Sequence, residues 1–296
     1  MTQDFVSGYV TMAGRPNVGK STLVNKLLSY PLSIVSSKPQ TTRHRLLGIL
    51  SGDAYQVIFL DSPGLMVPKY ALQAMMVKTA WSAISEADLV LLLTEPREDD
   101  LDGETRILAR LRQLRKRVIL AINKVDLVKK PDLLPVIQFY NGLFSFEEIV
   151  PVSALKEDGL DDLKRVIISR LPHQPAFYPA GEITDRPQRF FVAEIVRQKV
   201  FEQFGEEIPY SVAVVVDEYK EREQAKDYIR ATVVCERESQ KAILIGKRGE
   251  AVKRLGREAR SEIERFTGRG LFLELKVEVR ENWRRKDGAI KMLGQT

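Results

Sequence analysis

A glycine- and lysine-containing segment near the N-terminus has the residue types of a phosphate-binding loop. Residues 14–21 read GRPNVGKS, a complete Gly-x4-Gly-Lys-Ser pattern between a strand-like run and a helix-like run. Backbone amides of such a loop converge on phosphate oxygens, and the helix N-terminus adds the positive end of its dipole. Lys20 would reach the β- and γ-phosphates, and the Ser21 hydroxyl would ligate Mg²⁺. We therefore predict nucleotide contacts from Gly14, Arg15, Pro16, Asn17, Val18, Gly19, Lys20, Ser21 and Thr22.

Two more segments carry groups that a nucleotide-dependent switch needs. Asp61-Ser62-Pro63-Gly64 ends a strand-like run, so the Asp61 carboxylate can hold Mg²⁺ through water and the Gly64 amide can approach the γ-phosphate. In PQTTRHR, the Thr42 hydroxyl can reach Mg²⁺ only while a γ-phosphate is present, which would order residues 31–44 before hydrolysis. Further predicted nucleotide contacts are Asp61, Ser62, Pro63, Gly64 and Leu65; predicted metal ligands are Ser21, Thr42 and Asp61; predicted catalytic residues are Lys20, Thr42, Gly64 and Asn17.

The segment NKVD, residues 123–126, indicates which base the nucleotide carries. It follows an apolar run and so falls at the strand edge where open α/β sheets bind ligands. The Asp126 carboxylate can accept hydrogen bonds from N1–H and from the exocyclic amine of guanine, whereas adenine offers neither on that edge. The predicted contacts with guanine are Asn123, Lys124, Val125 and Asp126, together with Ser153 and Ala154, where a backbone amide would face O6.

A second glycine turn lies near the C-terminus, within KAILIGKRGEAVKRLGREAR, residues 241–260. This stretch holds seven basic and two acidic residues. The turn Gly246-Lys247-Arg248-Gly249 lacks the span and the Ser or Thr of a nucleotide loop, but it can press its amides against a sugar–phosphate backbone. Taken alone, Gly-x-x-Gly is also typical of a plain helix–helix turn. We predict an RNA clamp formed by Ile245, Gly246, Lys247, Arg248, Gly249, Lys253 and Arg254, with a groove for bases lined by Ile243, Ile245, Val252 and Leu255.

The elements that must position these loops alternate in the first part of the chain. Strands and helices in turn favour a mostly parallel sheet with helices on both faces, and the adjacent runs 45–51 and 55–60 favour one antiparallel hairpin. The other predicted strands are 8–13, 89–93, 118–122 and 149–152, and the predicted helices are 20–28, 71–85, 103–114, 132–143 and 160–171.

The second part has a different order after a proline-rich stretch. It reads helix 189–204, strand 210–218, strand 228–237, short helix 240–245, helix 249–266 and strand 271–280, a smaller α+β unit with the order of a type II KH domain. We predict a GTPase domain over 5–172, a linker over 173–188, a KH domain over 189–282 and a basic tail over 283–296.

Composition sets the broad class of protein. Apolar residues make up 44% of the 296 residues and charged residues 29%, as in ordinary globular proteins. The net charge of +6 favours a polyanionic partner. The only cysteine, Cys235, excludes an internal disulfide framework, and no apolar run can span a bilayer. We expect a cytoplasmic monomer.

The motifs GRPNVGKS, TTRH, DSPG, NKVD and VSA together resemble those of the Era family, a branch of the translation-factor-related GTPases. The stretch ITDRPQRFFVAEIVRQK, residues 183–199, also resembles the family's interdomain segment. The resemblance implies GTP and GDP as ligands, Mg²⁺, a single-stranded RNA target at the 3′ end of 16S rRNA, and a role in maturation of the 30S ribosomal subunit.

Two positions bear on the chemistry that the resemblance implies. Leu65 follows DSPG where Ras-like GTPases have a water-orienting glutamine, so unassisted hydrolysis should be slow. Asn17 stands where similar GTPases use an asparagine to hold K⁺ beside the phosphates, which the resemblance implies here; the alternative is a loop-stabilising amide. The basic residues 283–286 could contact phosphates or the inner face of the membrane, or form a solvated charge run.

Three functions fit these motifs. The first is a GTP-hydrolysing switch that controls RNA binding. The second is an RNA-binding assembly factor for which GTP is mainly a structural ligand. The third, a small-molecule kinase, is disfavoured by NKVD.

Overall fold

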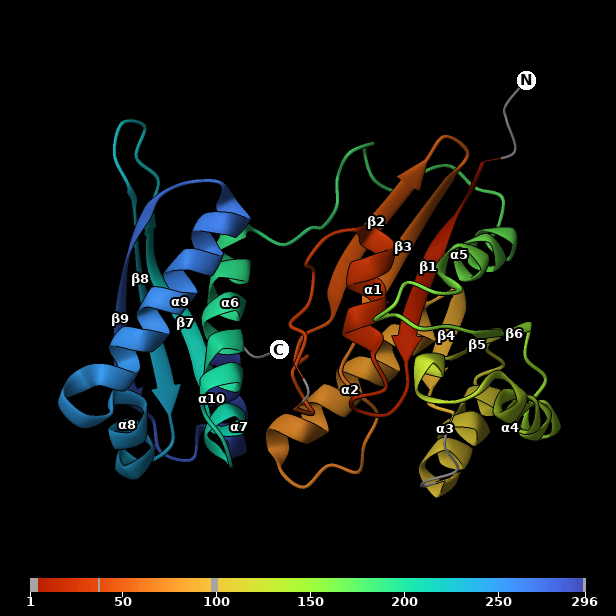
Figure 1. Ribbon diagram of the computed structural model, residues 1–296, viewed down its shortest axis with the longest axis horizontal. Helices are drawn as coiled ribbons and strands as arrows, with labels where there is room; N and C mark the ends of the chain where they lie inside the picture. The colour runs from red at the N-terminus through yellow and green to blue at the C-terminus, as the bar shows by residue number, and fades with distance from the viewer. Residues whose placement is uncertain (1–4, 37, 97–100, 295–296) are drawn as a thin grey trace. The chain divides into compact units, whose positions relative to one another are not determined.

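The computed structural model describes residues 5–36, 38–96 and 101–294 (Figure 1). By its internal contacts the chain divides into two compact units: the first holds residues up to Pro68 and Met75–Asp185, and the second holds Lys69–Ala74 and the residues from Arg186 on. Ser37 of the predicted switch loop and residues 295–296 of the predicted tail lie outside the described residues. No helix in the described part of the chain is long and apolar enough to cross a membrane.

The first unit is built on a six-stranded sheet with the order β2-β3-β1-β4-β5-β6. Only β2 and β3 pair antiparallel, and the other four pairs of neighbours are parallel, which confirms the predicted sheet. The strands are β1 (Val6–Ala13), β2 (Leu46–Gly52), β3 (Tyr55–Asp61), β4 (Leu89–Thr94), β5 (Val118–Ile122) and β6 (Glu148–Pro151).

Helices cover both faces of this sheet. Apolar side chains of α2, α3 and α4 pack together with those of β4 and β5 in one core cluster, and Figure 1 shows α1 and α5 on the opposite face. Every residue of β4 and β5 is buried, as expected for central parallel strands. The helices are α1 (Lys20–Leu28), α2 (Ala71–Glu86), α3 (Leu101–Gln113), α4 (Lys130–Leu143) and α5 (Leu160–Ser169), with a 3-10 turn at Val125–Leu127.

The segment predicted as a linker is fastened to the first unit by the side chain of Gln56, which is 1% exposed. Its Oε1 accepts hydrogen bonds from the amides of Phe177 (2.8 Å) and Tyr178 (3.0 Å), and its Nε2 donates to the Tyr178 carbonyl (2.9 Å). The Ile49 amide of β2 donates to the carbonyl of Ile183 (2.7 Å). Up to residue 183, the segment is therefore bound along the edge of the β2–β3 hairpin and is not a free linker.

The second unit has a three-stranded sheet with the order β7-β8-β9, in which β7 and β8 are antiparallel and β8 and β9 are parallel. Alternate residues of β8, such as Ile229 and Val233, join the core beneath α6 and α9, and Cys235 is a fully buried member of that core. The elements are α6 (Gln188–Gln203), α7 (Ile208–Ser211), β7 (Ala213–Lys220), β8 (Asp227–Cys235), α8 (Glu238–Ile245), a 3-10 turn (Lys247–Gly249), α9 (Glu250–Thr267), β9 (Leu271–Val279), a second 3-10 turn (Trp283–Arg285) and α10 (Asp287–Met292).

The C-terminal residues differ from the predicted tail. Trp283 is fully buried and its Nε1 donates a hydrogen bond to the Ser211 carbonyl (2.9 Å), while Ile290 of α10 is also buried. The Arg284 Nε donates to a carboxylate oxygen of Glu236 (2.9 Å). Residues 283–294 are thus part of the folded second unit, because the tryptophan and the apolar face of α10 need a core, and the prediction of a basic tail is wrong for them.

Candidate functional site

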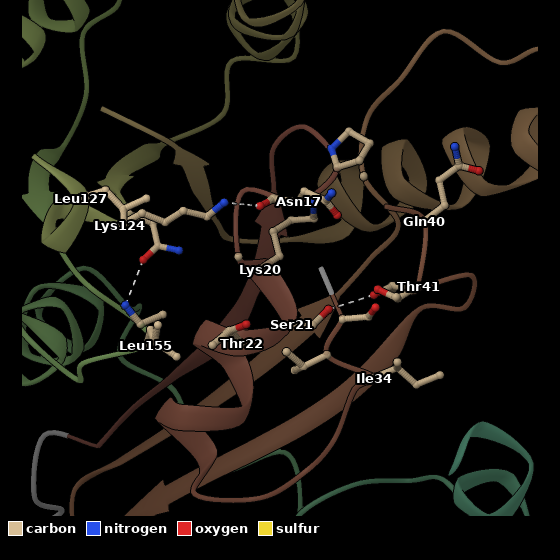
Figure 2. A pocket seen from close by; sticks show the side chains of 18 of the residues that line it. Asn17, Lys20, Ser21, Thr22, Ile34, Gln40, Thr41, Lys124, Leu127 and Leu155 are labelled. Carbon is tan, nitrogen blue, oxygen red and sulfur yellow. Dashed lines mark hydrogen bonds between the residues drawn. The ribbon is translucent and has the colours of Figure 1, made fainter. Parts of the chain in front are cut away.

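A cavity of about 500 Å³ lies at the carboxyl-terminal edge of the parallel sheet, where open α/β sheets bind ligands (Figure 2). Loops that follow β1, β3, β5 and β6 meet there, together with the loop between α1 and β2. The lining residues are Pro16, Asn17, Gly19, Lys20, Ser21, Thr22, Ile34, Val35, Ser36, Gln40, Thr41, Thr42, Gly64, Asn123, Lys124, Asp126, Leu127, Ala154 and Leu155.

The predicted phosphate loop has the backbone that its glycines allow. Gly14 has φ +140°, and a Cβ there would lie 2.5 Å from the Leu93 carbonyl oxygen. The Lys20 Nζ donates to the carbonyls of Gly14 (3.2 Å) and Arg15 (2.7 Å), which curls the loop around the ammonium. Burial lowers the pKa of Lys20 to about 8, although the nearby Asp61 carboxylate opposes that shift. A buried ammonium beneath a ring of amides is a site for an anionic ligand.

The three predicted Mg²⁺ ligands come together beside this loop. The Ser21 Oγ lies 2.9 Å from the Thr42 Oγ1 and donates to the Asp61 Oδ2 at 3.2 Å. Asp61 is fully buried, and its Oδ1 has no hydrogen-bond partner among the described residues. Burial raises the pKa of Asp61, against opposing hydrogen bonds of which that from Ser33 is the largest. Two hydroxyls and a buried, under-satisfied carboxylate are the oxygen donors that Mg²⁺ prefers, so these residues fit the ion.

Asn123 ties three loops of the cavity together. Its Nδ2 donates to the Val18 carbonyl (2.8 Å) and its Oδ1 accepts from the Ala154 amide (2.9 Å). Lys124 Nζ donates to the Asn17 carbonyl at 2.8 Å (Figure 2). The same ammonium also pairs with Glu95. These bonds fix the end of β5 against the phosphate loop, which places the wall of a base pocket at a set distance from the phosphates.

The Asp126 carboxylate lies at the exposed end of this pocket. Its Oδ1 accepts a hydrogen bond from the Ser153 Oγ (2.6 Å), and the Lys156 amide donates to the same Ser153 oxygen (3.2 Å). Ser153 therefore does not line the cavity itself. Its hydroxyl orients the Asp126 carboxylate, which does. The Asp126 carboxylate retains acceptor capacity for a ligand that offers two N–H donors.

Several predicted nucleotide contacts do not line the cavity. The Arg15 Nε is 3.3 Å from a carboxylate oxygen of Glu104 in α3, so this guanidinium is engaged on the side of the loop away from the cavity. The Ser62 Oγ donates to the Met12 carbonyl (3.1 Å) and Leu65 belongs to the core. The predicted residues outside the lining are Gly14, Arg15, Val18, Asp61, Ser62, Pro63, Leu65, Val125 and Ser153.

Sequence reasoning missed some residues that shape the cavity. Leu127 and Leu155 are 57% and 69% exposed and face the pocket next to Lys124 (Figure 2). Ser33 donates to the Asp61 Oδ2 at 2.6 Å. Leu127 and Leu155 each follow directly on a motif that was recognised, and their apolar side chains at loop positions were the available signal. Ser33 carried no such signal, since its loop has no periodic pattern.

The Gly-x-x-Gly turn joins α8 to α9 in the second unit. Gly246 has φ +72°, and a Cβ there would lie 2.7 Å from the Ala251 Cβ, so only glycine fits. Lys247 and Arg248 are both exposed, and Arg248 has φ +53°. The turn thus carries two basic side chains outward on a tight, strained backbone, as a phosphate-contacting clamp requires.

A groove of about 330 Å³ runs beside this turn between α9 and β9. Three of its lining side chains are basic and none is acidic; the lining residues are Val252, Lys253, Gly256, Arg257, Arg260, Phe272, Leu273 and Leu275. The expectation that Leu255 lines a groove is wrong, because Leu255 is fully buried in the core. Arg254 leans toward α6, where its Nε donates to the Gln203 side chain at 3.2 Å. Arg257, Arg260 and Phe272 were missed because their neighbours come from a strand distant in sequence.

The fold and the two sites together define a P-loop GTPase joined to a C-terminal KH domain. Residues 9–124 match a family described as 50S ribosome-binding GTPase, and residues 207–284 match the KH domain family.

Similar proteins narrow this class further. The GTPase Era of Geotalea daltonii is 46% identical over 292 residues, 99% of this chain and 98% of that protein. A chloroplastic Era-like GTPase of Arabidopsis thaliana is 43% identical over 97% of this chain and 68% of that protein. A crystal structure of a point variant of Aquifex aeolicus Era bound to GDP and AlF4⁻ has a TM-score of 0.95, with 38% identity over 99% of this chain and all of that one. A crystal structure of Era with MgGDPNP and nucleotides 1506–1542 of 16S ribosomal RNA has the same TM-score and identity over 99% of both chains. The chain belongs to the Era family of GTPases.

Proposed function

We propose that this GTPase is a switch that binds single-stranded ribosomal RNA at the 3′ end of 16S rRNA and acts in assembly of the 30S subunit. The observation that carries the proposal is the presence of two anion sites of different shape in one chain. The first is a cavity of about 500 Å³ with a lysine at its phosphate end and a carboxylate at its base end, and the second is a groove of about 330 Å³ lined by three basic and no acidic side chains, beside a glycine clamp. The first suits a free nucleotide and the second suits a strand.

In the cavity, each residue has a separate task toward GTP. Lys20 neutralises the β- and γ-phosphates, and Asp126 accepts the two N–H donors of guanine. Ser21, Thr42 and Asp61 would hold Mg²⁺, which would neutralise charge on the phosphate oxygens. The Gly64 amide would contact the γ-phosphate. Gly64 packs closely against the phosphate loop, since a Cβ at this position would lie only 2.8 Å from the Pro16 nitrogen, and so its backbone can approach a bound phosphate.

Hydrolysis needs an aid that Leu65 does not provide. Its side chain is buried and apolar, so it cannot orient the attacking water. K⁺ held beside the phosphates by Asn17 would supply positive charge at that place. The test is GTP turnover in K⁺ and then in Na⁺, with Asn17→Ala as the variant. Equal rates in both salts would remove K⁺ from the proposal.

Lys247 and Arg248 of the turn and Lys253 of the groove would neutralise phosphates, while the apolar lining of the groove accepts unstacked bases. Support for a 16S target comes from the Era structure that contains nucleotides 1506–1542 of that RNA and has a TM-score of 0.95 to this chain. Lys247→Asp with Arg248→Asp should abolish binding of an unpaired oligoribonucleotide and spare basal GTPase activity. The matched control is the same charge change at Lys129 and Lys130, which are exposed in the first unit.

One experiment separates a switch from a factor that uses GTP only as a structural ligand. GTP turnover is measured with and without an oligonucleotide of the 16S 3′ end, and RNA affinity is measured with GDP and with a non-hydrolysable GTP analogue. A switch requires RNA affinity that differs between the two nucleotide states. Equal affinities would favour the passive factor. The cytoplasmic location, the monomeric state and contact with the membrane surface stay predictions of the sequence.

A further inference from the structure

A serine in the loop between α1 and β2 reaches the buried carboxylate of the predicted metal site. The Ser33 Oγ donates to the Asp61 Oδ2 at 2.6 Å, a length typical of a hydroxyl bonded to a charged carboxylate. The Ser21 Oγ donates to the same oxygen at 3.2 Å. The other oxygen of Asp61, Oδ1, is buried and has no hydrogen-bond partner among the described residues. The two hydroxyls therefore fix which oxygen of the carboxylate stays available for a ligand.

The backbone of Ser33 is held by helix α1. The Asn25 Nδ2 donates to the Ser33 carbonyl (2.8 Å), and the Ser33 amide donates to the Asn25 Oδ1 (3.0 Å). On either side of Ser33, the side chains of Leu32 and Ile34 are buried. Asn25 follows Ser21 by about one helical turn, so one face of α1 carries both the predicted metal ligand and the group that holds Ser33. All of these contacts are made by the protein itself, so the position of Ser33 does not depend on a γ-phosphate.

Ser33 is not placed to contact the nucleotide. It is buried and does not belong to the cavity lining, whereas the three residues that follow it, Ile34, Val35 and Ser36, line the cavity. At the other end of the same loop, Thr42 is a predicted Mg²⁺ ligand whose contact with the ion requires a γ-phosphate. The two ends of the loop therefore differ: the first is fixed by the fold, and the second depends on the nucleotide state.

We propose that Ser33 is a positioning residue of the metal site, which orients the Asp61 carboxylate for Mg²⁺ in both the GDP and the GTP state. This inference rests on the proposed Mg²⁺ site and adds to it a residue that touches neither the metal nor the nucleotide. Partners of this kind hold a metal-binding group in one orientation, and loss of one typically costs about 10- to 100-fold in metal affinity. The same contacts divide the predicted switch loop, because the part released on hydrolysis then lies between Val35 and Thr42.

The test measures how Mg²⁺ raises the affinity of the full chain for a fluorescent GDP analogue, with free Mg²⁺ titrated upward from EDTA. Ser33→Ala should raise the Mg²⁺ concentration needed for half of the effect by roughly 10- to 100-fold. In EDTA its affinity for the analogue should equal that of the wild type, because Ser33 touches no part of the nucleotide. The matched control is Ser7→Ala, a buried serine of the first unit whose Oγ donates to the Pro175 carbonyl (2.7 Å). This control should keep the Mg²⁺ dependence of the wild type.

Two comparisons identify the role of Ser33. The first repeats the titration with a non-hydrolysable GTP analogue, where Ser33→Ala should shift the Mg²⁺ dependence by the same factor as with GDP. Thr42→Ala should shift it with the GTP analogue only. The second comparison uses Asn25→Ala, which should shift the Mg²⁺ dependence in the same direction as Ser33→Ala. The double variant should show no further shift, because the two residues act through one contact with Asp61.

Three results would overturn the proposal. The first is an unchanged Mg²⁺ dependence in Ser33→Ala. The second is an affinity that falls by the same factor in EDTA and in Mg²⁺, since that result would assign Ser33 to the fold of the loop alone. The third is a shift confined to the GTP analogue. If Mg²⁺ did not raise the affinity of the wild type for either nucleotide, the proposed metal site itself would fail.

Discussion

Replacing Gln56 by alanine should destabilise the first unit through loss of its attachment to residues 177–183. The side-chain amide bonds three backbone groups, the two amides of Phe177 and Tyr178 and the carbonyl of Tyr178, at 2.8–3.0 Å. An alanine leaves all three without that partner in a partly buried place. At about 1 kcal/mol for each lost bond, the free energy of unfolding should fall by about 3 kcal/mol. For a unit of this size that corresponds to roughly 6–12 °C in Tm.

The measurement is calorimetric unfolding of the full chain with and without GDP. Because GDP binds the first unit, the transition that GDP raises belongs to that unit and is the one to compare. The control is Gln138→Ala on α4, where the glutamine is exposed and the change should stay within about 0.5 kcal/mol. A Gln56→Ala transition as close to the wild type as that of the control would show that the segment is not held by these bonds.

Three further predictions concern the cavity. Asp126→Asn should move nucleotide preference from GTP to XTP, measured by competition binding; an unchanged preference for GTP would refute the base assignment. The pKa of Lys20 is about 8 in the free protein, and a bound phosphate would raise it. GDP binding at pH 9 should therefore take up a proton at Lys20, and GDP affinity should fall as pH rises above 8. At pH 7 this proton uptake should be absent, which calorimetry in buffers of different ionisation enthalpy tests. Asn123→Ala removes the bonds to Val18 and Ala154, so it should weaken GTP and GDP equally by roughly tenfold or more, and a loss confined to GTP would contradict a bracing role.

The attachment through Gln56 has a consequence for the switch. The β2–β3 hairpin lies between the loop that contains Thr42 and the turn that begins at Asp61, and both of these reach the cavity's metal ligands. The same hairpin holds the segment that leads out of the first unit. A movement of the hairpin with nucleotide state would therefore act directly on that segment.

The sequence by itself determined the local motifs and the class of fold. GRPNVGKS, DSPG and NKVD are short and contiguous, so their backbone shape and chemistry depend on adjacent residues, and the structure brings residues of all three to one cavity. The alternation of strands and helices likewise predicted the mostly parallel sheet, because the period of apolar residues is a local property. Gly246 could be recognised for the same reason, since its turn needs a glycine whatever surrounds it.

Only the tertiary structure decided the direction of side chains whose neighbours in sequence are compatible with more than one environment. Arg15 lies within the phosphate loop yet pairs with Glu104, and Leu255 lies beside the clamp yet enters the core. Trp283 follows a solvent-exposed segment but finds a partner at Ser211. Gln56 and Phe272 owe their roles to chain segments far away in sequence. In each case the direction of the side chain is set by the burial and hydrogen bonding that distant residues offer, and no pattern of neighbouring residues encodes those distances.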